Sequence, residues 1–537
     1  MNKSGYTFFT DPKNVSISNP IPGREAEMVS NLAGGMAFVA EDAVALRRWL
    51  LTGSESNAFY QTKEELTSTN VKLLSEMVAK NPSIVADEIL YATEHGIDNH
   101  APLLALVYLS MGNDSAKILF KRIFNRVVRT ASMLYEFMEY TKGLRGFGKL
   151  IHTAIDGWIS SRDVKNLEYQ FLKYQNRYNW TGRDVLRKIK PIPRNVTESN
   201  LFAWMSGRDR VDGKGEDLKL VEIYEKLKAG VNEDEAVKAI LDFNLTHEMI
   251  PANIARTAKV WDALYHKMPI TATMRNLANL TDKGIFVPAN LDILEERFSK
   301  ENLKKGRIHP IAMAVAYKIY TAGGTRGRTQ LKWTPIARVE DILEKAVNDA
   351  FETLEPTGKV FYHAVDVSGS MGQSELDKIW MTPREVAAIM ALATIKTEKN
   401  YFTSAFSKDA INFPDLRASM SFRDIINGNH LKGIPREYVG SLTDLGSAIT
   451  YAINNKIKAD VMVFWTDNQS WKGTHPSIVL KEYRAKVNPD VKAIYVAMIP
   501  YGDHVSLTDP RDTKSYDIAG FSTETPRLVQ MIANGEM

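Results

Sequence analysis

Apolar residues between about residues 40 and 350 recur with the spacing of amphipathic helices. They occupy positions i, i+3, i+4 and i+7 in the successive segments 40–51, 70–80, 82–96, 101–112 and 115–140. Asn81-Pro82-Ser83, Gly96 and Gly112 supply turn and cap signals between these segments. Convincing strand patterns are absent from this region, and its repeats have no fixed length. The pattern predicts short helices stacked as hairpins, an α-solenoid that can close on itself.

The pattern changes after about Pro356. Short runs rich in Val, Ile, Phe and Tyr alternate with segments of helical periodicity, and we expect buried parallel strands in KVFYHAVDVS, NYFTSAF, ADVMVFWTD and VKAIYVAMIP. Such alternation predicts a doubly wound α/β domain. With EPTG as the boundary turn, we divide the chain into an N-terminal segment (1–24), an α-helical repeat domain (25–355) and an α/β domain (356–537).

Length and composition agree with at least two globular domains. The chain has 537 residues, 44% of them hydrophobic and 25% charged, and no cysteine. Disulfides, thiolate zinc sites and a cysteine nucleophile are therefore excluded. The first residues, MNKSGYTFFTDP, do not fit a signal peptide, and the longest apolar run is shorter than the roughly 20 residues of a membrane span. We expect a cytoplasmic protein that makes no membrane contact.

One acid and two hydroxyls follow the first predicted strand of the α/β domain. Asp366, Ser368 and Ser370 leave its carboxyl end, and Thr443 and Asp467 lie where later elements reach the same edge of the sheet. Oxygen ligands of this kind suit Mg²⁺ and match zinc poorly. A strand and turn with a capping serine is the structural alternative.

The D-x-S-x-S pattern with a downstream Thr and Asp resembles the metal-ion-dependent adhesion site of von Willebrand factor A domains. The resemblance implies that a Mg²⁺ ion is held by Asp366, Ser368, Ser370, Thr443 and Asp467, with a carboxylate of a partner completing the shell. Neutral hydroxyl ligands leave the cation electron-poor, which favours an external acid.

Positive charge is concentrated in one part of the chain. The whole chain carries a net charge of +4, whereas residues 121–190 hold 15 basic and 6 acidic side chains. Such a concentration suits a polyanionic partner.

We expect Lys173 and Arg177, four residues apart, to share a helix face with Tyr174, Tyr178 and Trp180 interleaved. Cationic side chains neutralise phosphates, and exposed aromatic rings stack on bases, so this segment favours RNA binding. The alternative interpretation is an ordinary solvated helix face with buried aromatic residues. The candidate RNA contacts here are Arg145, Lys149, Lys173, Arg177, Arg183, Arg187 and Lys190.

The order of motifs along the chain resembles the Ro autoantigen family, whose members carry the TROVE module (named for telomerase, Ro and vault proteins). The motifs are GLRGFGK, KYQNRYNWTGRDVLR, MPITATMRNLANL, RIHPIAMAVAYKIYTAG, LKW and EPTGKVFYHAVDVSGSM, and the similarity spans roughly residues 25 to 515. The resemblance implies a Ro protein of the bacterial type. Its expected architecture is a HEAT-like ring of helical repeats closed by a doubly wound von Willebrand factor A domain.

The resemblance also implies RNA binding. In the family, small Y RNAs bind the outer basic surface, and single-stranded 3′ ends of misfolded RNAs enter the central hole. Bacterial members are associated with exoribonucleases such as polynucleotide phosphorylase. Lys173 and Arg177 fall on the family's basic pair, and Lys190 stands where the family often has histidine. For the hole we expect contacts from Arg275, His309, Arg326 and Arg328, with pairing to a neighbouring helix end as the alternative for Arg275.

Three functions are open at this point. The first, which we favour, is a monomeric, non-enzymatic protein that binds a Y-type RNA and delivers misfolded RNA to an exoribonuclease. The second is an adaptor that captures an acidic residue of a partner protein through Mg²⁺. The third is a hydrolase with a catalytic Mg²⁺ on Asp366 and Asp467. The hydroxyl-rich ligand set and the lack of a recognisable base in the sequence disfavour the third, so we assign no catalytic residues.

Overall fold

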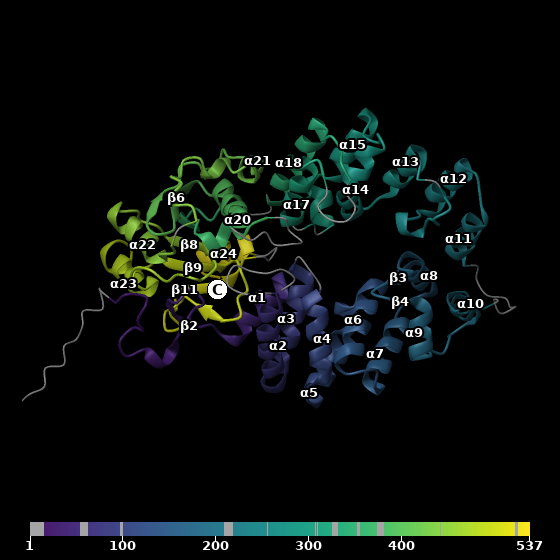
Figure 1. Ribbon diagram of the computed structural model, residues 1–537, viewed down its shortest axis with the longest axis horizontal. Helices are drawn as coiled ribbons and strands as arrows, with labels where there is room; N and C mark the ends of the chain where they lie inside the picture. The colour runs from purple at the N-terminus through teal and green to yellow at the C-terminus, as the bar shows by residue number, and fades with distance from the viewer. Residues whose placement is uncertain are drawn as a thin grey trace, which may run out of the picture.

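The computed structural model describes residues 15–53, 63–96, 100–208, 218–254, 256–306, 308, 310–324, 331–351, 355–372, 381–440, 442–520 and 525–536. Figure 1 shows a long curved series of helices that leaves an α/β domain and returns to it. The helices of this series are α1 (Asp42–Thr52), α2 (Lys63–Lys80), α3 (Pro82–His95), α4 (His100–Met111), α5 (Asp114–Val127), α6 (Ala131–Leu144), α7 (Lys149–Ser160), α8 (Val164–Lys173), α9 (Gly182–Ile189), α10 (Val196–Met205), α11 (Lys219–Ala229), α12 (Glu233–Phe243), α13 (Ala258–Lys267), α14 (Ile270–Asp282), α15 (Pro288–Arg297), α16 (Lys300–Lys305), α17 (Pro310–Thr321) and α18 (Ala337–Phe351).

Helix α5 shows how the sequence pattern forms these elements. The side chain of Asn113 accepts a hydrogen bond from the amide of Ala116 and so caps the first turn. Residues at helical spacing, including Phe120 and Phe124, are buried against Phe137 of α6. The helices bury their apolar faces against their neighbours, as the periodicity predicted, and form two extended core clusters, one of which continues into the α/β domain.

Parallel strands form the centre of the α/β domain, as predicted. The sheet order is β11-β9-β8-β5-β6-β7, and only the pairing of β7 with β6 is antiparallel. Its strands are β5 (Val360–Asp366), β6 (Asn400–Phe406), β7 (Ala410–Asn412), β8 (Val461–Thr466), β9 (Lys492–Ala497) and β11 (Ser515–Ala519). The helices of the domain are α19 (Gly369–Gly372), α20 (Pro383–Thr397), α21 (Phe422–Ile426), α22 (Leu445–Asn454), α23 (Pro476–Lys486) and α24 (Thr525–Asn534).

Burial on both faces explains why the strands are almost entirely apolar. On β5, Phe361 and Val365 belong to one core cluster, which includes residues of α20. Tyr362 and Ala364 alternate with them and belong to a second cluster with residues of α22. A strand enclosed in this way has no polar face, which is the composition that predicted a parallel sheet.

The described N-terminal residues pack against the α/β domain. Strands β1 (Met28–Ser30), β2 (Met36–Val39) and β10 (Val505–Ser506) form a small antiparallel sheet. The buried guanidinium of Arg24 donates to both carboxylate oxygens of Asp509, at 2.9 and 3.1 Å. The amide of Asn31 donates to the backbone oxygen of Ser470 at 2.7 Å. The start of the described chain therefore supports the loop that follows β8.

The helical series contacts the α/β domain at both of its ends, which makes a ring. Arg48 of α1 forms an ion pair with Asp517 of β11. At the other end, the ammonium of Lys318 on α17 lies 3.0 Å from both carboxylate oxygens of Glu385 on α20. Between these ends, contacts join α8 to α11, α11 to α12, α12 to α13 and α14 to α17. The predicted ring of helical repeats plus a doubly wound domain is therefore confirmed.

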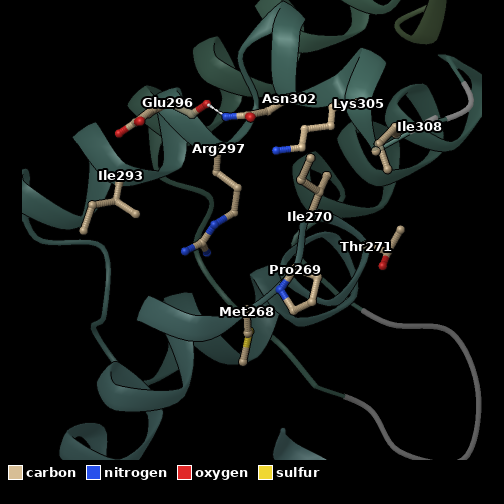
Figure 2. A pocket seen from close by; sticks show the side chains of 11 residues that line it. Met268, Pro269, Ile270, Thr271, Ile293, Glu296, Arg297, Asn302, Lys305 and Ile308 are labelled. Atoms are coloured by element: carbon tan, nitrogen blue, oxygen red, sulfur yellow. Dashed lines mark hydrogen bonds between the residues drawn. The ribbon is translucent and has the colours of Figure 1, made fainter. Parts of the chain in front are cut away.

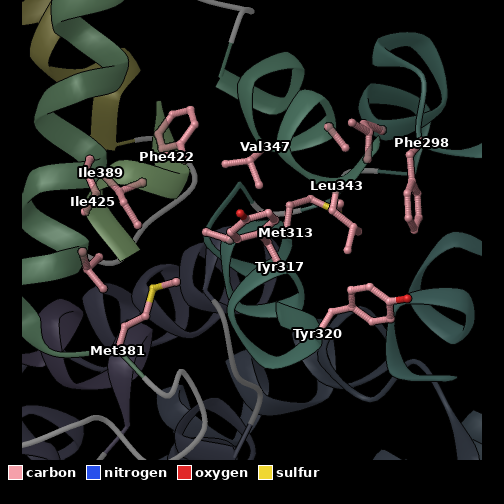
Figure 3. Close-up of a cluster of buried hydrophobic side chains, with 14 of the residues drawn as sticks. Phe298, Met313, Tyr317, Tyr320, Leu343, Val347, Met381, Ile389, Phe422 and Ile425 are labelled. Atoms are coloured by element: carbon pink, nitrogen blue, oxygen red, sulfur yellow. The ribbon is translucent and has the colours of Figure 1, made fainter. Parts of the chain in front are cut away.

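Apolar contacts reinforce the second junction. Figure 3 shows Tyr317 and Val347 of the helical series in the same cluster as Phe422 and Ile425 of the α/β domain. The hydroxyl of Tyr317 accepts a hydrogen bond of 2.6 Å from Nε of Arg423. None of the helices in the described part of the chain combines the length and hydropathy that a bilayer crossing requires.

We expect Lys318→Ala to lower the free energy of unfolding by roughly 1–2 kcal/mol, because it leaves the half-buried carboxylate of Glu385 without its cation. Lys345→Ala is the control, since Lys345 pairs with Glu295 while 62% of its side chain is exposed, and such pairs are worth about 0–1 kcal/mol. Denaturant unfolding of the two variants measures the difference. Equal losses would mean that the Lys318–Glu385 pair does not secure the junction.

Candidate nucleic-acid interface and metal site

A two-stranded hairpin stands at the centre of the basic stretch. Helix α8 ends at Lys173, and Arg177 belongs to β3 (Asn176–Arg177), which pairs with β4 (Trp180–Thr181). The turn residues Tyr178 and Asn179 have φ angles of 53° and 60°. A two-residue hairpin turn with positive φ at both positions matches the twist of the strands. The expectations that this region lacks strands and that Lys173 and Arg177 share a helix face are therefore wrong.

Aromatic residues hold the hairpin against the helices. The indole of Trp180 donates a 2.7 Å hydrogen bond to Glu139 of α6, and its ring centroid lies 5.7 Å from that of Phe147. The ammonium of Lys188 lies 4.8 Å from the centroid of Phe147. Trp180 thus has a structural role, whereas Tyr178 at the turn is 41% exposed. The two interpretations of the aromatic residues therefore each hold in part, because Trp180 is half-buried and packed, whereas Tyr178 is at the surface.

Helix α9 presents a cationic stripe next to the hairpin. Thr181 and Asp184 form a capping box at its start, and Val185, Leu186 and Ile189 are buried. Three exposed cations lie away from these residues: two are four residues apart on one helix face, and the third is the C-cap residue directly after the helix. These are Arg183, Arg187 and Lys190.

These cations have no acidic partner in the described part of the chain. No carboxylate lies within 4.0 Å of any of them, and the same holds for Arg177 and Lys149, which are also exposed. By contrast, Arg126 on α5 pairs with Glu94 at 3.0 Å. The cations around the hairpin therefore keep their charge available for an external anion.

Two predicted RNA contacts are half-buried. The ammonium of Lys173 lies 5.4–5.5 Å from the ring centroids of Tyr169 and Tyr174. Burial opposes its charged form, but Tyr174, Tyr169 and Glu248 outweigh burial and raise the pKa of Lys173. Arg145 donates from Nη1 to the hydroxyl of Ser110 at 2.8 Å and to the Ser110 backbone oxygen, and burial lowers its pKa. Arg145 thus joins α6 to α4, and we leave it out of the interface.

The residues predicted to line the hole are only partly placed. Arg275 of α14 is exposed, and no carboxylate among the described residues lies within 4.0 Å of it. This removes the alternative of an ion pair at a neighbouring helix end within that part of the chain. His309, Arg326 and Arg328 lie outside the described residues.

The predicted metal ligands converge at the carboxyl edge of the sheet. Oδ1 of Asp366 accepts a hydrogen bond from the amide of Ser368 at 2.9 Å, and the hydroxyls of Ser368 and Ser370 lie 3.3 Å apart. Ser370 lies close enough to Asp467 to lower the pKa of that carboxyl group, and Oδ1 of Asp467 accepts a hydrogen bond of 3.0 Å from the amide of Gln469. The backbone oxygen of Thr443 accepts from the hydroxyl of Ser470 and the amides of Trp471 and Lys472, which places Thr443 beside the segment after Asp467.

The charges of this site favour a bound cation. All five side chains are at most 2% exposed. Burial raises the pKa of Asp366, and burial together with the nearby charge of Asp366 raises the pKa of Asp467. Oδ2 of Asp467 is buried without a hydrogen-bond partner in the described part of the chain. A divalent cation would supply the missing partner and neutralise both carboxylates, so the residues present fit Mg²⁺.

Sequence reasoning missed one charged neighbour of the metal site. Arg384, in the first turn of α20, donates from Nη1 to the backbone oxygen of Val367 at 3.1 Å. Its guanidinium lies against Gly372, where a Cβ atom would come within 2.2 Å of it. Its charge lowers the pKa of Asp366. No sequence pattern links Arg384 to DVSGS, because only the packing of α20 on the sheet brings them together.

The fold and the two sites define a class of protein in which a von Willebrand factor A-type domain closes a ring of helical repeats. Residues 29–320 match the TROVE domain, and residues 361–533 match the Ro60 vWA domain. The TROVE match covers more than half of the chain, and the chain belongs to the Ro family of TROVE-domain proteins. The family resemblance inferred from the motifs is thereby confirmed.

Full-length relatives share this organisation. The chain is 29% identical to the "RNA-binding protein RO60" of Caenorhabditis elegans, over 95% of this chain and 90% of the relative. It is 28% identical to the protein of the same name from Deinococcus radiodurans, over 96% of both chains. The crystal structure of the Deinococcus radiodurans RO (RSR) protein matches with a TM-score of 0.68 and 26% identity, over 93% of this chain and all of that one.

Proposed function

We propose that the chain is an RNA-binding protein whose basic surface around hairpin β3–β4 holds a small structured RNA of the Y type. The observation that carries this proposal is the group of exposed cations without acidic partners in the described part of the chain: Lys149, Arg177, Arg183, Arg187 and Lys190. Phosphate contacts from such residues position a nucleic acid without reading its bases. The relatives named as RNA-binding proteins support the same function.

The proposal includes a second contact for single-stranded 3′ ends of misfolded RNA in the centre of the ring. We propose that Arg275 contributes to this contact, because it is exposed without an acidic partner among the described residues and its charge is available for a phosphate. In this proposal the chain acts as a cytoplasmic monomer that delivers RNA to an exoribonuclease such as polynucleotide phosphorylase, and it performs no catalytic step itself.

Sequencing the RNA that copurifies with the native protein tests this function. We expect one small structured RNA to dominate, with fragments of larger RNAs as a minor fraction. Incubating the purified protein with RNA and Mg²⁺ should leave the RNA intact. Protein that carries no nucleic acid, or RNA turnover that Asp366→Ala abolishes, would contradict the proposal.

A second function is supported by the metal site. We propose that Asp366, Ser368, Ser370, Thr443 and Asp467 hold Mg²⁺, which binds an acidic group of a partner protein. The unpartnered Oδ2 of Asp467 favours this function. Arg384, half-buried near Asp366, would add positive potential for the incoming acid. The two functions use different parts of the molecule and can coexist.

A further inference from the structure

A cavity of about 540 Å³ opens in the helical series between α13 and α16. These helices lie on the upper arc in Figure 1, whereas hairpin β3–β4 lies on the lower arc. Four apolar residues form much of its wall, and one arginine and one lysine extend into it, as Figure 2 shows. The residues are Met268, Ile270, Ile293 and Ile308, with Arg297 and Lys305. They come from the junction of α13 and α14, the end of α15, and α16 with the residues after it. The volume lies within the range of small-molecule sites.

The guanidinium of Arg297 is held in place. Nη1 donates to the hydroxyl of Thr273 at 3.0 Å, and Nη2 donates to the backbone oxygen of Tyr265 at 2.9 Å. The guanidinium also lies 4.6 Å from the centroid of the Tyr265 ring. These bonds use two of its five N–H donors. Arg297 is thus pre-oriented and retains donors for a further acceptor.

The two cations of the cavity, Arg297 and Lys305, form no ion pair within the described part of the chain. Within the described residues no carboxylate lies within 4.0 Å of Arg297 or Lys305. Glu296 also lines the cavity, and its backbone oxygen accepts a 2.9 Å hydrogen bond from Asn302 (Figure 2). Helix α14 begins at this cavity, after Pro269, without a side-chain cap, so the N-terminal end of its dipole adds to the positive potential.

We propose that this cavity binds a phosphorylated nucleotide, with the phosphate on Arg297 and Lys305 and the nucleoside against the apolar wall. A guanidinium with fixed orientation suits a phosphate, because two of its donors can bind two oxygens. Four apolar side chains give a planar base a surface to cover. The nucleotide is either a free mononucleotide or the phosphorylated end of an RNA strand. This site goes beyond the RNA surface at the hairpin and does not depend on it.

Calorimetric titration of the full chain with AMP, adenosine and inorganic phosphate tests the proposal. We expect AMP to bind more tightly than either adenosine or phosphate. Lys305→Ala should weaken AMP binding roughly tenfold, since it removes a charged hydrogen-bond donor. Lys304→Ala is the matched control, because Lys304 is an exposed neighbour on α16 that does not line the cavity. Equal affinity in the two variants, or no binding of AMP, overturns the proposal.

A second variant separates a loss of AMP binding from a loss of protein stability. Thr271 lines the cavity and is exposed in the first turn of α14, where a glutamate is favourable for the helix. Thr271→Glu should therefore leave the melting temperature unchanged or raise it, while repelling a phosphate and weakening AMP binding at least tenfold. Unchanged AMP affinity in Thr271→Glu overturns the proposal.

Competition distinguishes the two sources of the phosphate. A 5′-phosphorylated oligonucleotide that displaces AMP, when its unphosphorylated counterpart does not, identifies an RNA end as a ligand. If neither displaces AMP, the free nucleotide is the ligand. Arg177→Ala should leave AMP binding unchanged, which separates this site from the proposed RNA surface. Loss of AMP binding in that variant overturns the separate site.

Discussion

Replacing Arg177, Arg183 and Arg187 by alanine in one variant is expected to weaken binding of the copurifying small RNA by roughly 100-fold at physiological salt. Each side chain is exposed without an acidic partner in the described part of the chain, so each can neutralise one phosphate. The slope of log K against log salt should become shallower by about 3, one unit for each lost phosphate contact. Fluorescence anisotropy with the labelled RNA at several salt concentrations measures both quantities.

The matched control for this variant replaces two cations that the protein already neutralises. Lys117 and Arg126 lie on α5 and pair with Asp114 and Glu94 at 3.2 and 3.0 Å. Alanine at both positions should change RNA affinity less than about twofold, because exposed ion pairs contribute little free charge. If the triple variant retains the parent affinity and salt slope with an unchanged melting temperature, RNA does not bind at the hairpin.

Asp467→Asn is expected to abolish stabilisation by Mg²⁺ and to make the metal-free protein less sensitive to pH. Folding raises the pKa of Asp366 and of Asp467, so the native state binds protons more tightly than the unfolded state. Metal-free stability therefore falls as pH rises from about 4 through the raised pKa values. Mg²⁺ requires the deprotonated carboxylates, so its effect should be small at pH 5 and large at pH 8.

The expected size of the metal effect follows from linkage. At 100 times its dissociation constant, a ligand adds about 2.7 kcal/mol, which corresponds to roughly 5–10 °C in the melting temperature of a domain of this size. Thermal unfolding between pH 5 and pH 8, with Mg²⁺ or EDTA, measures the shift. Asp467→Asn should melt at a higher temperature than the parent in EDTA at pH 8, because one of two repelling buried charges is removed.

Asp444→Asn provides the control for the metal site. Asp444 caps α22, and burial raises its pKa to about 6, but it is not among the proposed ligands. Asparagine also caps helices, so this variant should fold normally and keep the full response to Mg²⁺. A response to Mg²⁺ that survives in Asp467→Asn but not in Asp444→Asn would place the metal elsewhere.

Local periodicity was sufficient to predict most of the elements that carry the sites. Helices such as α3 and α4 and the strands β5, β6, β8 and β9 were predicted because each buries a face, or both faces, through residues at a regular spacing. The predicted run 115–140 is divided into α5 and α6. Short elements without such spacing were missed, among them β7, β11 and the hairpin β3–β4. The hairpin has four paired residues, and its turn depends on positive φ at Tyr178 and Asn179, which the sequence pattern did not reveal.

The clustering of most of the proposed metal ligands was predictable, because Asp366, Ser368, Ser370 and Asp467 follow strand ends that a parallel sheet brings to one edge. Asp366 and Asp467 lie at the ends of adjacent strands β5 and β8, and their strand-end positions together with the resemblance to the adhesion site led us to pair them. Arg384 was not predictable in this way, since its contact with Val367 depends on how α20 packs on the sheet.

For the basic surface, composition identified the segment of the chain that is rich in cations. The tertiary structure determined which of those cations are exposed and unpaired within the described residues. The excess of cations in residues 121–190 can be counted in the sequence. Composition does not show which of these charges the fold neutralises or buries. Packing turned Arg145 and Lys173 inward and left Arg183 and Arg187 without acidic partners within the described residues. Periodic burial is a local property that residues encode directly, whereas the availability of a charge depends on neighbours that are distant in the chain.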